Sequence, residues 1–344
     1  MVVRLGIVGT DHIAARMVKC VAQLPDVRIT AIANTAQGPA APLASPIGAA
    51  VCEDEVELAA RNDVDAVYVT NSRPNHAAAV RAAIAAGKHV LVEKPIALTA
   101  KETAPLVVAA RKAKVLLVEN LWCLAVPAAQ ALIDHADRQT FGKPVLFSLD
   151  FGFPVKPELY PALFSPQLGV LRDRGVYGIA FARRLLGPIE DLSAYINWLG
   201  DVDTSTTLTL RHRSGALSKL GFSFDALLAN KATLACSGGI FRLEPSFGAE
   251  NLTSQVAEAQ VGPLTKVRGN RIRSLPMVRA LRRWRKAIKP ESFSFGNDVH
   301  LPMLRHFVDL IVEGKTESPL VPLDLSIDTQ RHIESVRERV SAAA

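Results

Sequence analysis

The sequence predicts an α/β protein in two parts: a doubly wound parallel sheet, then an α+β part with a large open, mostly antiparallel sheet. Over the first 120 residues, apolar β-rich runs alternate with Ala-rich helical stretches, and beyond them strand-like segments follow one another closely. The chain has 344 residues, more than the roughly 100–200 of one ordinary domain. We expect one domain over residues 1–120, a second over 121–322, and a C-terminal helix over 323–344 that packs back on the first.

Five apolar runs predict the strands of the first sheet. Because these runs are apolar on both faces, they belong in a parallel sheet covered by helices. Gly87 lies just past one helical stretch, where a left-handed helix end favours glycine. Repeated strand–helix units with right-handed connections make the sheet doubly wound. The expected strands are 2–8, 27–33, 66–70, 89–93 and 115–118, with helices at 75–86 and 99–113 and a loop at 37–46.

The second part has a different pattern. A helix over 170–186 ends at Gly187-Pro188, and Arg213-Ser214-Gly215 is a tight turn between two strand-like segments. Such turns favour antiparallel pairing. An open antiparallel sheet has one face that needs covering, so we expect a homodimer or homotetramer through that face. The other expected elements are helices at 128–136, 299–313 and 325–340, and strands at 145–151, 192–199, 204–211, 216–224, 232–235 and 240–243.

The net charge of +7 comes from one segment, residues 261–290, which holds ten Lys or Arg and no acid. Within it, Met277, Leu281, Trp284 and Ile288 have helical spacing, which predicts a basic amphipathic helix over 277–289. Such a helix can bind nucleic acid or a membrane surface, or attract a phosphate-bearing or carrier-linked substrate. We favour a solvent-exposed segment of the second domain whose apolar stripe packs on the sheet. We expect no nucleic-acid partner.

Composition excludes several classes of protein. No apolar run reaches the about 20 residues of a membrane helix, and the N-terminal run is typical of a strand rather than a signal peptide. The four cysteines and eight histidines lack metal-ligand or redox spacing. We therefore expect a cytoplasmic protein with reduced cysteines and no bound metal.

A glycine-containing turn follows the first strand and precedes a helix, an arrangement that lets a pyrophosphate approach backbone amides. In the dinucleotide-binding (Rossmann) pattern G-x-G-x-x-G/A, Gly9 and Ala14 fit the first and third places, but Asp11 holds the middle one. A carboxylate there faces phosphate charge unless it caps a helix amide, and we favour the cap. A turn without a ligand is the alternative. The candidate cofactor contacts in this stretch are Gly6, Gly9, Thr10, Asp11, His12 and Ile13.

The end of the second strand discriminates between dinucleotides. An acid there binds the ribose hydroxyls of NAD, and a basic residue accepts the phosphate of NADP. This chain has Asn34-Thr35, which is neither. The cofactor is therefore predicted as NAD(P), with a slight preference for NADP.

Three motifs resemble those of a known family. They are Asn75-His76 followed by a stretch that ends in Glu93-Lys94-Pro95-Ile96-Ala97, then Asp173-Arg174-Gly175-Val176-Tyr177, then Gly314-Lys315-Thr316-Glu317-Ser318-Pro319. In this order they resemble the glucose–fructose oxidoreductase / inositol dehydrogenase / rhizopine-catabolism (Gfo/Idh/MocA) family across nearly the whole chain. The resemblance implies a dehydrogenase that moves hydride between nicotinamide C4 and an alcohol or ketone of a sugar, cyclitol or related small molecule.

The resemblance also implies roles for individual residues. Lys94 would touch the substrate oxygen and the nicotinamide ribose, Tyr177 would act as acid/base, and Asp173 would orient them. The further cofactor contacts are Asn34, Thr35, Asn71, His76 and Glu93, and the candidate substrate contacts are Asn120, Trp122 and Arg174.

The residues themselves agree with these roles. Lys94 follows a central strand, at the edge where open α/β sheets bind ligands. Asp173 and Tyr177 are four residues apart and share one helix face. An ammonium close to a tyrosine favours its phenolate. The structural alternatives are a surface lysine at a turn and a tyrosine buried in the core.

Departures from the family pattern leave a rival interpretation open. Asp11 replaces a glycine, and Leu124 and Val126 stand where many members carry Arg and His, which would make the pocket wall more apolar. The alternative is a family member with weakened or lost catalysis that binds a dinucleotide or another ligand. The intact Lys94 and Tyr177 argue against it.

Overall fold

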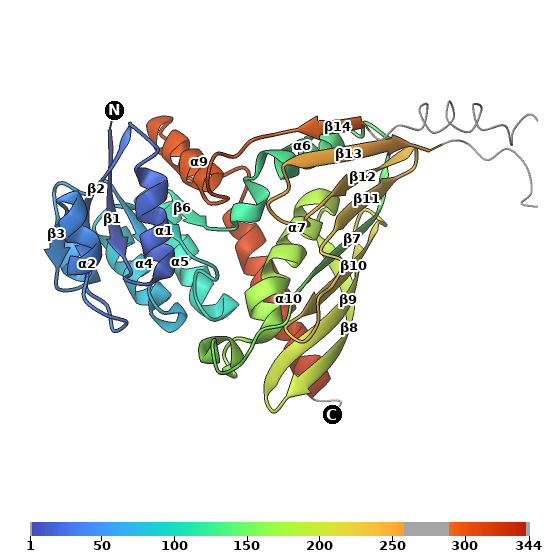
Figure 1. The fold of residues 1–344 in the computed structure, drawn as a ribbon, viewed down its shortest axis with the longest axis horizontal. Coiled ribbons are helices and arrows are strands. Elements are labelled where there is room, and N and C mark those ends of the chain that lie inside the picture. Colours follow the sequence, from blue (N-terminus) through green and yellow to red (C-terminus); the bar gives the residue numbers. More distant parts are fainter. Residues whose placement is uncertain (1, 258–288, 342–344) are drawn as a thin grey trace, which may run out of the picture.

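The computed structural model describes residues 2–257 and 289–341, which form two sheets with helices packed between them (Figure 1). The first sheet has six parallel strands in the order β3-β2-β1-β4-β5-β6. The second has eight strands in the order β14-β13-β12-β11-β7-β10-β9-β8 and is antiparallel except for the pairing of β7 with β10. The predicted fold class is confirmed.

The first sheet reverses its order at β1 and β4, which are neighbours although β2 and β3 separate them in sequence. Such a switch point opens a crevice at the carboxyl ends of the strands, where ligands bind. The sequence prediction missed the short β3 and α3, and α2 lies within the expected loop. The elements are β1 (Val3–Val8), α1 (His12–Val21), β2 (Val27–Ala33), α2 (Ala41–Ala44), β3 (Ala50–Cys52), α3 (Glu55–Ala60), β4 (Ala66–Val69), α4 (His76–Ala85), β5 (His89–Val92), α5 (Ala100–Ala113) and β6 (Leu117–Glu119).

The second sheet carries its helices on the face that looks towards the first sheet (Figure 1). A π-helical turn at Leu171–Gly175 leads directly into α7. The elements are α6 (Pro127–Asp137), β7 (Pro144–Gly152), α7 (Val176–Leu186), β8 (Ile189–Leu199), β9 (Val202–His212), β10 (Leu217–Ser223), β11 (Ala232–Cys236), β12 (Gly239–Leu243), β13 (Asn251–Val256), β14 (Lys289–Ser292), α9 (Leu301–Val312) and α10 (Leu323–Ser341).

Helix α10 connects the two parts of the molecule. Gln330 donates a hydrogen bond to the carbonyl of Ala97 at 2.5 Å and accepts one from Thr103 of α5 at 2.6 Å. On its other side, Asp328 pairs with Arg183 of α7 at 2.5 Å. Because α10 holds α5 and α7 together, it fixes the turn after β5 relative to the helix that carries Tyr177.

The predicted basic helix over 277–289 lies almost wholly outside the described residues; its last position, Lys289, opens strand β14. Across the described part of the chain, every helix is too short or too polar to cross a membrane.

Candidate active site

The turn after β1 leads into helix α1. Asp11 Oδ1 accepts hydrogen bonds from the amides of Ile13 at 3.1 Å and Ala14 at 2.8 Å. Thr70 donates a longer one, of 3.3 Å, to the same oxygen. The expected cap is confirmed, and it directs the negative charge of Asp11 at the positive end of α1. A Cβ on Gly9 would overlap Thr70 Cγ2, so the turn packs against the end of β4 only because Gly9 has no side chain.

The remaining residues of this stretch lie around the same edge. Gly6 is inside β1, and His12 is exposed at the first position of α1. Thr10 Oγ1 lies 3.0 Å from Thr35 Oγ1, which ties the turn to the end of β2. Asn34 Oδ1 accepts a hydrogen bond of 2.8 Å from the backbone amide six residues later. The end of β2 therefore offers hydroxyl and amide groups to a dinucleotide, and neither Asn34 nor Thr35 brings a charge.

His76 lies behind the crevice. Its ring is 1% exposed, and its two nitrogens are 2.7 Å from the carbonyl oxygen of Pro95 and 2.9 Å from that of Asn71. Burial lowers the pKa of His76. His76 therefore ties the turn after β5 to the loop after β4. Asn71 Oδ1 is buried without a hydrogen-bond partner among the described residues.

Lys94 and Asp173 meet between the two parts of the chain. Lys94 Nζ donates to the Asp173 carbonyl at 2.7 Å and to its Oδ1 at 2.8 Å. Arg73 lies 3.3 Å from the same oxygen. Burial lowers the pKa of Lys94, although Asp173 opposes this. Burial would raise the pKa of Asp173, but the charges of Lys94 and Arg73 outweigh it and hold that pKa below its usual value. Sequence reasoning missed Arg73, whose separation of 100 residues from Asp173 gives no local signal.

Tyr177 is buried one helical turn beyond Asp173. Its phenol oxygen accepts a hydrogen bond of 3.0 Å from Trp122 Nε1. Lys94 Nζ lies 5.0 Å from the centre of the tyrosine ring rather than at the phenol oxygen. Burial raises the pKa of Tyr177 well above its usual value, so the expectation of a favoured phenolate is wrong. Tyr177 is held as a neutral phenol, which is a proton donor.

A polar network lies beside these residues. Glu93 Oε1 accepts hydrogen bonds from Tyr68 at 2.6 Å and from Asn120 Nδ2 at 2.5 Å. Asn120 Nδ2 is also 3.3 Å from His300 Nδ1. The network joins the ends of β4, β5 and β6 to the start of α9. Sequence reasoning missed His300, and no motif marks it.

Arg174 lies away from this network, inside the second part of the chain. It is 2% exposed, and its guanidinium donates to the carbonyls of Phe153 and Ser223. The guanidinium carbon is 4.0 Å from the ring centre of Phe153 and 4.6 Å from that of Phe224. Burial lowers the pKa of Arg174 to about 10. This arrangement fastens the π-helical turn that presents Asp173.

The two apolar substitutions noted in the sequence, Leu124 and Val126, are at most 1% exposed and belong to the core. They do not make the pocket wall apolar. The apolar neighbours of Tyr177 are aromatic: Phe247 has its ring centre 5.5 Å from that of Tyr177 and 6.3 Å from that of Trp122.

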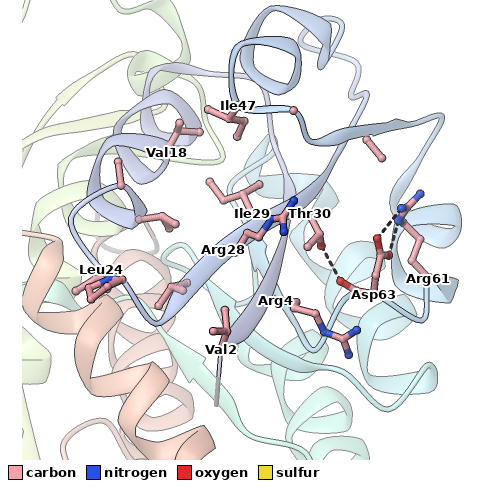
Figure 2. A pocket seen from close by; sticks show the side chains of 16 residues that line it. Val2, Arg4, Val18, Leu24, Arg28, Ile29, Thr30, Ile47, Arg61 and Asp63 are labelled. Carbon is pink, nitrogen blue, oxygen red and sulfur yellow. Dashed lines mark hydrogen bonds and ion pairs between the residues drawn. The ribbon is translucent and has the colours of Figure 1, made fainter.

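A groove of about 930 Å³ lies at the opposite edge of the first sheet, where β1 and β2 begin (Figure 2). Two of its three arginines already have acidic partners, since Arg4 pairs with Asp65 and Arg61 with Asp63. Ligands of parallel sheets bind at the carboxyl ends of the strands, and this groove is at the amino ends.

Comparison with known proteins finds one family over both parts of the chain. Residues 3–121 match the model of an oxidoreductase family with an NAD-binding Rossmann fold, and residues 129–242 match the GFO/IDH/MocA C-terminal domain. A dTDP-3,4-didehydro-2,6-dideoxy-alpha-D-glucose 3-reductase of Streptomyces antibioticus is 31% identical over 252 residues, which are 71% of this chain and 76% of that protein. A trans-1,2-dihydrobenzene-1,2-diol dehydrogenase of Oryctolagus cuniculus is 27% identical over 289 residues, 83% of this chain and 81% of that one.

Among solved structures, a 3-ketoreductase from Actinomadura kijaniata in complex with TDP-benzene and NADP is 25% identical with a TM-score of 0.74. The alignment covers 98% of this chain and 97% of that one. Both family models, the sequence relatives and the shared architecture lead to one assignment: the chain belongs to the Gfo/Idh/MocA family of NAD(P)-dependent oxidoreductases.

Proposed function

We propose that this chain interconverts an alcohol and a ketone on the ring of a sparsely hydroxylated sugar or carbocycle, using NAD(P) with a slight preference for NADP. Lys94 and Tyr177 would act at the reacting oxygen. The observation that carries this proposal is the junction of Lys94 with Asp173 and Tyr177, which brings an ammonium and a neutral phenol to the carboxyl edge of the first sheet. We assign dinucleotide binding to residues 1–120, substrate binding to 121–322, and the joining helix to 323–344.

The residues present fit a dinucleotide. Asn71 Oδ1 at the end of β4 is buried without a partner in the described part of the chain. Leaving a buried acceptor unpaired costs about 1–3 kcal/mol, which donors on a bound ligand would offset. Thr10 and Thr35 frame the other end of the same edge. When bound, the dinucleotide supplies or accepts the hydride.

The protein side chains handle the proton. In the direction of reduction, Tyr177 donates its phenolic proton to the substrate oxygen as negative charge develops there. Trp122 occupies one lone pair of the phenol oxygen, which orients the O–H bond. Lys94 stabilises the developing charge, and Asp173 holds its ammonium in place. The phenolate left by this donation regains a proton from solvent before the next reduction or, in the direction of oxidation, from the substrate hydroxyl.

The pocket wall supports a substrate with an apolar ring face. Trp122, Phe151 and Phe247 cluster around Tyr177, with Phe151 and Phe247 ring centres 4.9 Å apart. Aromatic rings contact the faces of deoxy sugars and carbocycles well, but they offer few partners for hydroxyl groups. The two sequence relatives are named for substrates of this kind, a dideoxy sugar and a dihydrodiol. The proposed substrates include a sugar that bears a phosphate group or is linked to a carrier.

Fluorescence titration with NADPH and NADH, followed by turnover, tests the proposal. The substrates to compare are a dTDP-linked dideoxy-3-ketosugar, the same sugar without the nucleotide, and a cyclohexadiene diol. We expect binding of both dinucleotides, tighter for NADPH, and turnover that Tyr177→Phe abolishes without loss of binding. Dinucleotide binding without turnover of any of the three would favour the rival interpretation, a non-catalytic binding protein. Asp11 is the observation that keeps that rival open, because it occupies two amides of α1.

We further propose a homo-oligomer, dimer or tetramer, through the outer face of the eight-stranded sheet. Helices of the described residues cover only its inner face (Figure 1). The outer face presents Tyr195, 84% exposed, beside Thr207, and Leu217, 43% exposed, beside Leu146. Light scattering on the wild type and on Thr207→Glu tests this, because a charge on this face, beside Tyr195 of the edge strand β8, should dissociate the oligomer. The cytoplasmic location stays a prediction.

A further inference from the structure

His300 is held on several sides at the boundary of the two parts of the chain. It is 6% exposed, and its ring centre lies 5.5 Å from that of Trp122. Its backbone amide donates to Asp298 Oδ1 at 2.9 Å. Asp298 also pairs with Arg16 of helix α1 at 2.5 Å. The histidine is therefore linked through Asp298 to the helix that follows the glycine turn, and its ring packs at a tilt of 41° against Trp122, the residue that bonds to Tyr177.

The neighbours of His300 determine which of its ring nitrogens carries hydrogen. Asn120 Nδ2 faces both Glu93 Oε1 and His300 Nδ1. Turning the amide over would place its oxygen against the Glu93 carboxylate, which already takes a hydrogen from Tyr68. The NH₂ group must therefore face Glu93, and His300 Nδ1 must accept from it. This requires a neutral imidazole with its hydrogen on Nε2.

We infer that His300 is a positioning residue of the active site, which as a neutral imidazole holds Asn120 and Trp122 in the arrangement that orients the phenol of Tyr177. The inference rests on the proposed role of Tyr177 as proton donor. Protonation would put a hydrogen on His300 Nδ1 opposite the amide hydrogens of Asn120. The amide could then satisfy either the imidazolium or Glu93, but not both.

The charged groups around His300 oppose one another. Glu93 at the end of β5 and Asp298 on its own loop favour the charged ring, whereas Arg16 of α1 and Lys94 disfavour it. Burial is the largest influence and lowers the pKa of His300. Loss of the arrangement is therefore expected at acid pH, below the usual range of histidine, and the working form is complete at neutral pH.

Three variants separate the roles of this side chain. His300→Asn places an amide oxygen where Nδ1 stands, so it keeps the acceptor and removes the titration. His300→Leu removes the acceptor at similar volume. His306→Asn is the matched control, because His306 lies on α9, the helix that begins just after His300, and bonds to Ser318 instead. Rates against pH, dinucleotide affinity, and ¹⁵N spectra of histidine-labelled protein are measured for each.

We expect His300→Leu to lower kcat by about 10- to 100-fold, the scale of a slightly misplaced reacting group, with dinucleotide affinity unchanged. His300→Asn should rescue most of this loss and abolish the acid limb of kcat, and the control should keep the wild-type profile. The spectrum should show His300 Nδ1 without hydrogen at neutral pH. A hydrogen on Nδ1 at neutral pH, or a wild-type kcat and pH profile in His300→Leu, would overturn the inference. The spectrum needs no turnover, so it tests His300 even if the proposed function fails.

Discussion

Replacing Asp11 by Asn should tighten dinucleotide binding and leave the stability of the protein nearly unchanged. The carboxylate of Asp11 accepts from the amides of Ile13 and Ala14, which belong to the helix end that a pyrophosphate approaches. Asparagine caps a helix as well as aspartate does. The substitution therefore removes one negative charge from the phosphate side of the site and keeps the hydrogen bonds that shape the turn.

The size of the effect follows from the charge. Two unit charges about 4 Å apart repel by about 1–4 kcal/mol at effective dielectric constants of about 80 to 20. That range corresponds to about 5- to 1000-fold in affinity. Because Asp11 directs its charge towards the positive end of α1, the part that reaches a phosphate is reduced. We expect the lower end, a gain of about 5- to 10-fold in the affinity for NADPH.

Two alanine variants, Asp11→Ala and Asp54→Ala, separate the effect of the Asp11 charge on dinucleotide binding from the effect of a lost helix cap on stability. Asp54 caps α3 in the same way, accepting from the amides of Val56 at 2.9 Å and Glu57 at 2.8 Å, after β3 and so two strands away from the glycine turn. Losing either cap should lower the free energy of unfolding by about 1 kcal/mol. Asp54→Ala should show this loss with wild-type dinucleotide affinity, and Asp11→Ala should show it together with tighter binding.

Calorimetric titration with NADPH at two salt concentrations, beside urea unfolding, measures both quantities. The gain in Asp11→Asn should shrink at the higher salt concentration, because salt screens a repulsion between exposed charges. An affinity in Asp11→Asn equal to or weaker than that of the wild type would refute the reasoning, since the carboxylate would then not face the phosphates at all.

Three further predictions concern single side chains. Lys94→Ala should lower kcat by roughly 10²–10⁴-fold, the scale of a positioned proton-transfer group, measured by the absorbance of NADPH at saturating substrate. Trp122→Phe removes the donor to the Tyr177 phenol and should lower kcat by about 3- to 10-fold, the worth of one hydrogen bond, with the wild-type circular dichroism spectrum as control. Burial raises the pKa of Glu119 from 4.5 to about 7, so the stability it contributes is present below about pH 4.5 and is lost as the pH rises through 7. Glu119→Gln should therefore raise the free energy of unfolding at pH 8 by roughly 3 kcal/mol and flatten its dependence on pH, measured by urea unfolding.

Local sequence patterns predicted most of the first sheet, because each of its long strands is a continuous apolar run. The strand expected at 27–33 is β2 to the residue, whereas β3 has only three residues and too little pattern to detect. In the second sheet, the turn at Arg213-Ser214-Gly215 predicted the antiparallel pairing of β9 with β10. The parallel pairing of β10 with β7 has no such signal, since Leu217 and Leu146 meet only through the packing of the whole sheet.

In the active site, too, local features could be predicted from the sequence and long-range contacts could not. Asp173 and Tyr177 could be placed on one helix face from their spacing, and Lys94 from the turn that follows its strand. Contacts that cross between the two parts of the chain could not be predicted: Arg73 reaches Asp173 over 100 residues, and Asn120 reaches His300 over 180. The protonation of Tyr177 was mispredicted for a related reason. The family resemblance brings Lys94 close to Tyr177 and so suggested a stabilising charge, but burial of the phenol is a property of the assembled core.

The contacts between the two sheets therefore have a chemical consequence. Lys94 comes from the first sheet, and its partner Asp173 comes from the turn before α7. Arg16 of the first part and Asp298 of the second make another such pair, beside His300. Of the two pairs, Lys94–Asp173 is the buried one. A buried ion pair contributes little net stability, since desolvation offsets its attraction, but breaking it leaves an uncompensated charge. Tyr177, the proton donor, and the ammonium of Lys94 are therefore correctly placed relative to each other only when the two parts are packed as α10 holds them. A change that disturbs this packing should lower kcat before it unfolds either sheet.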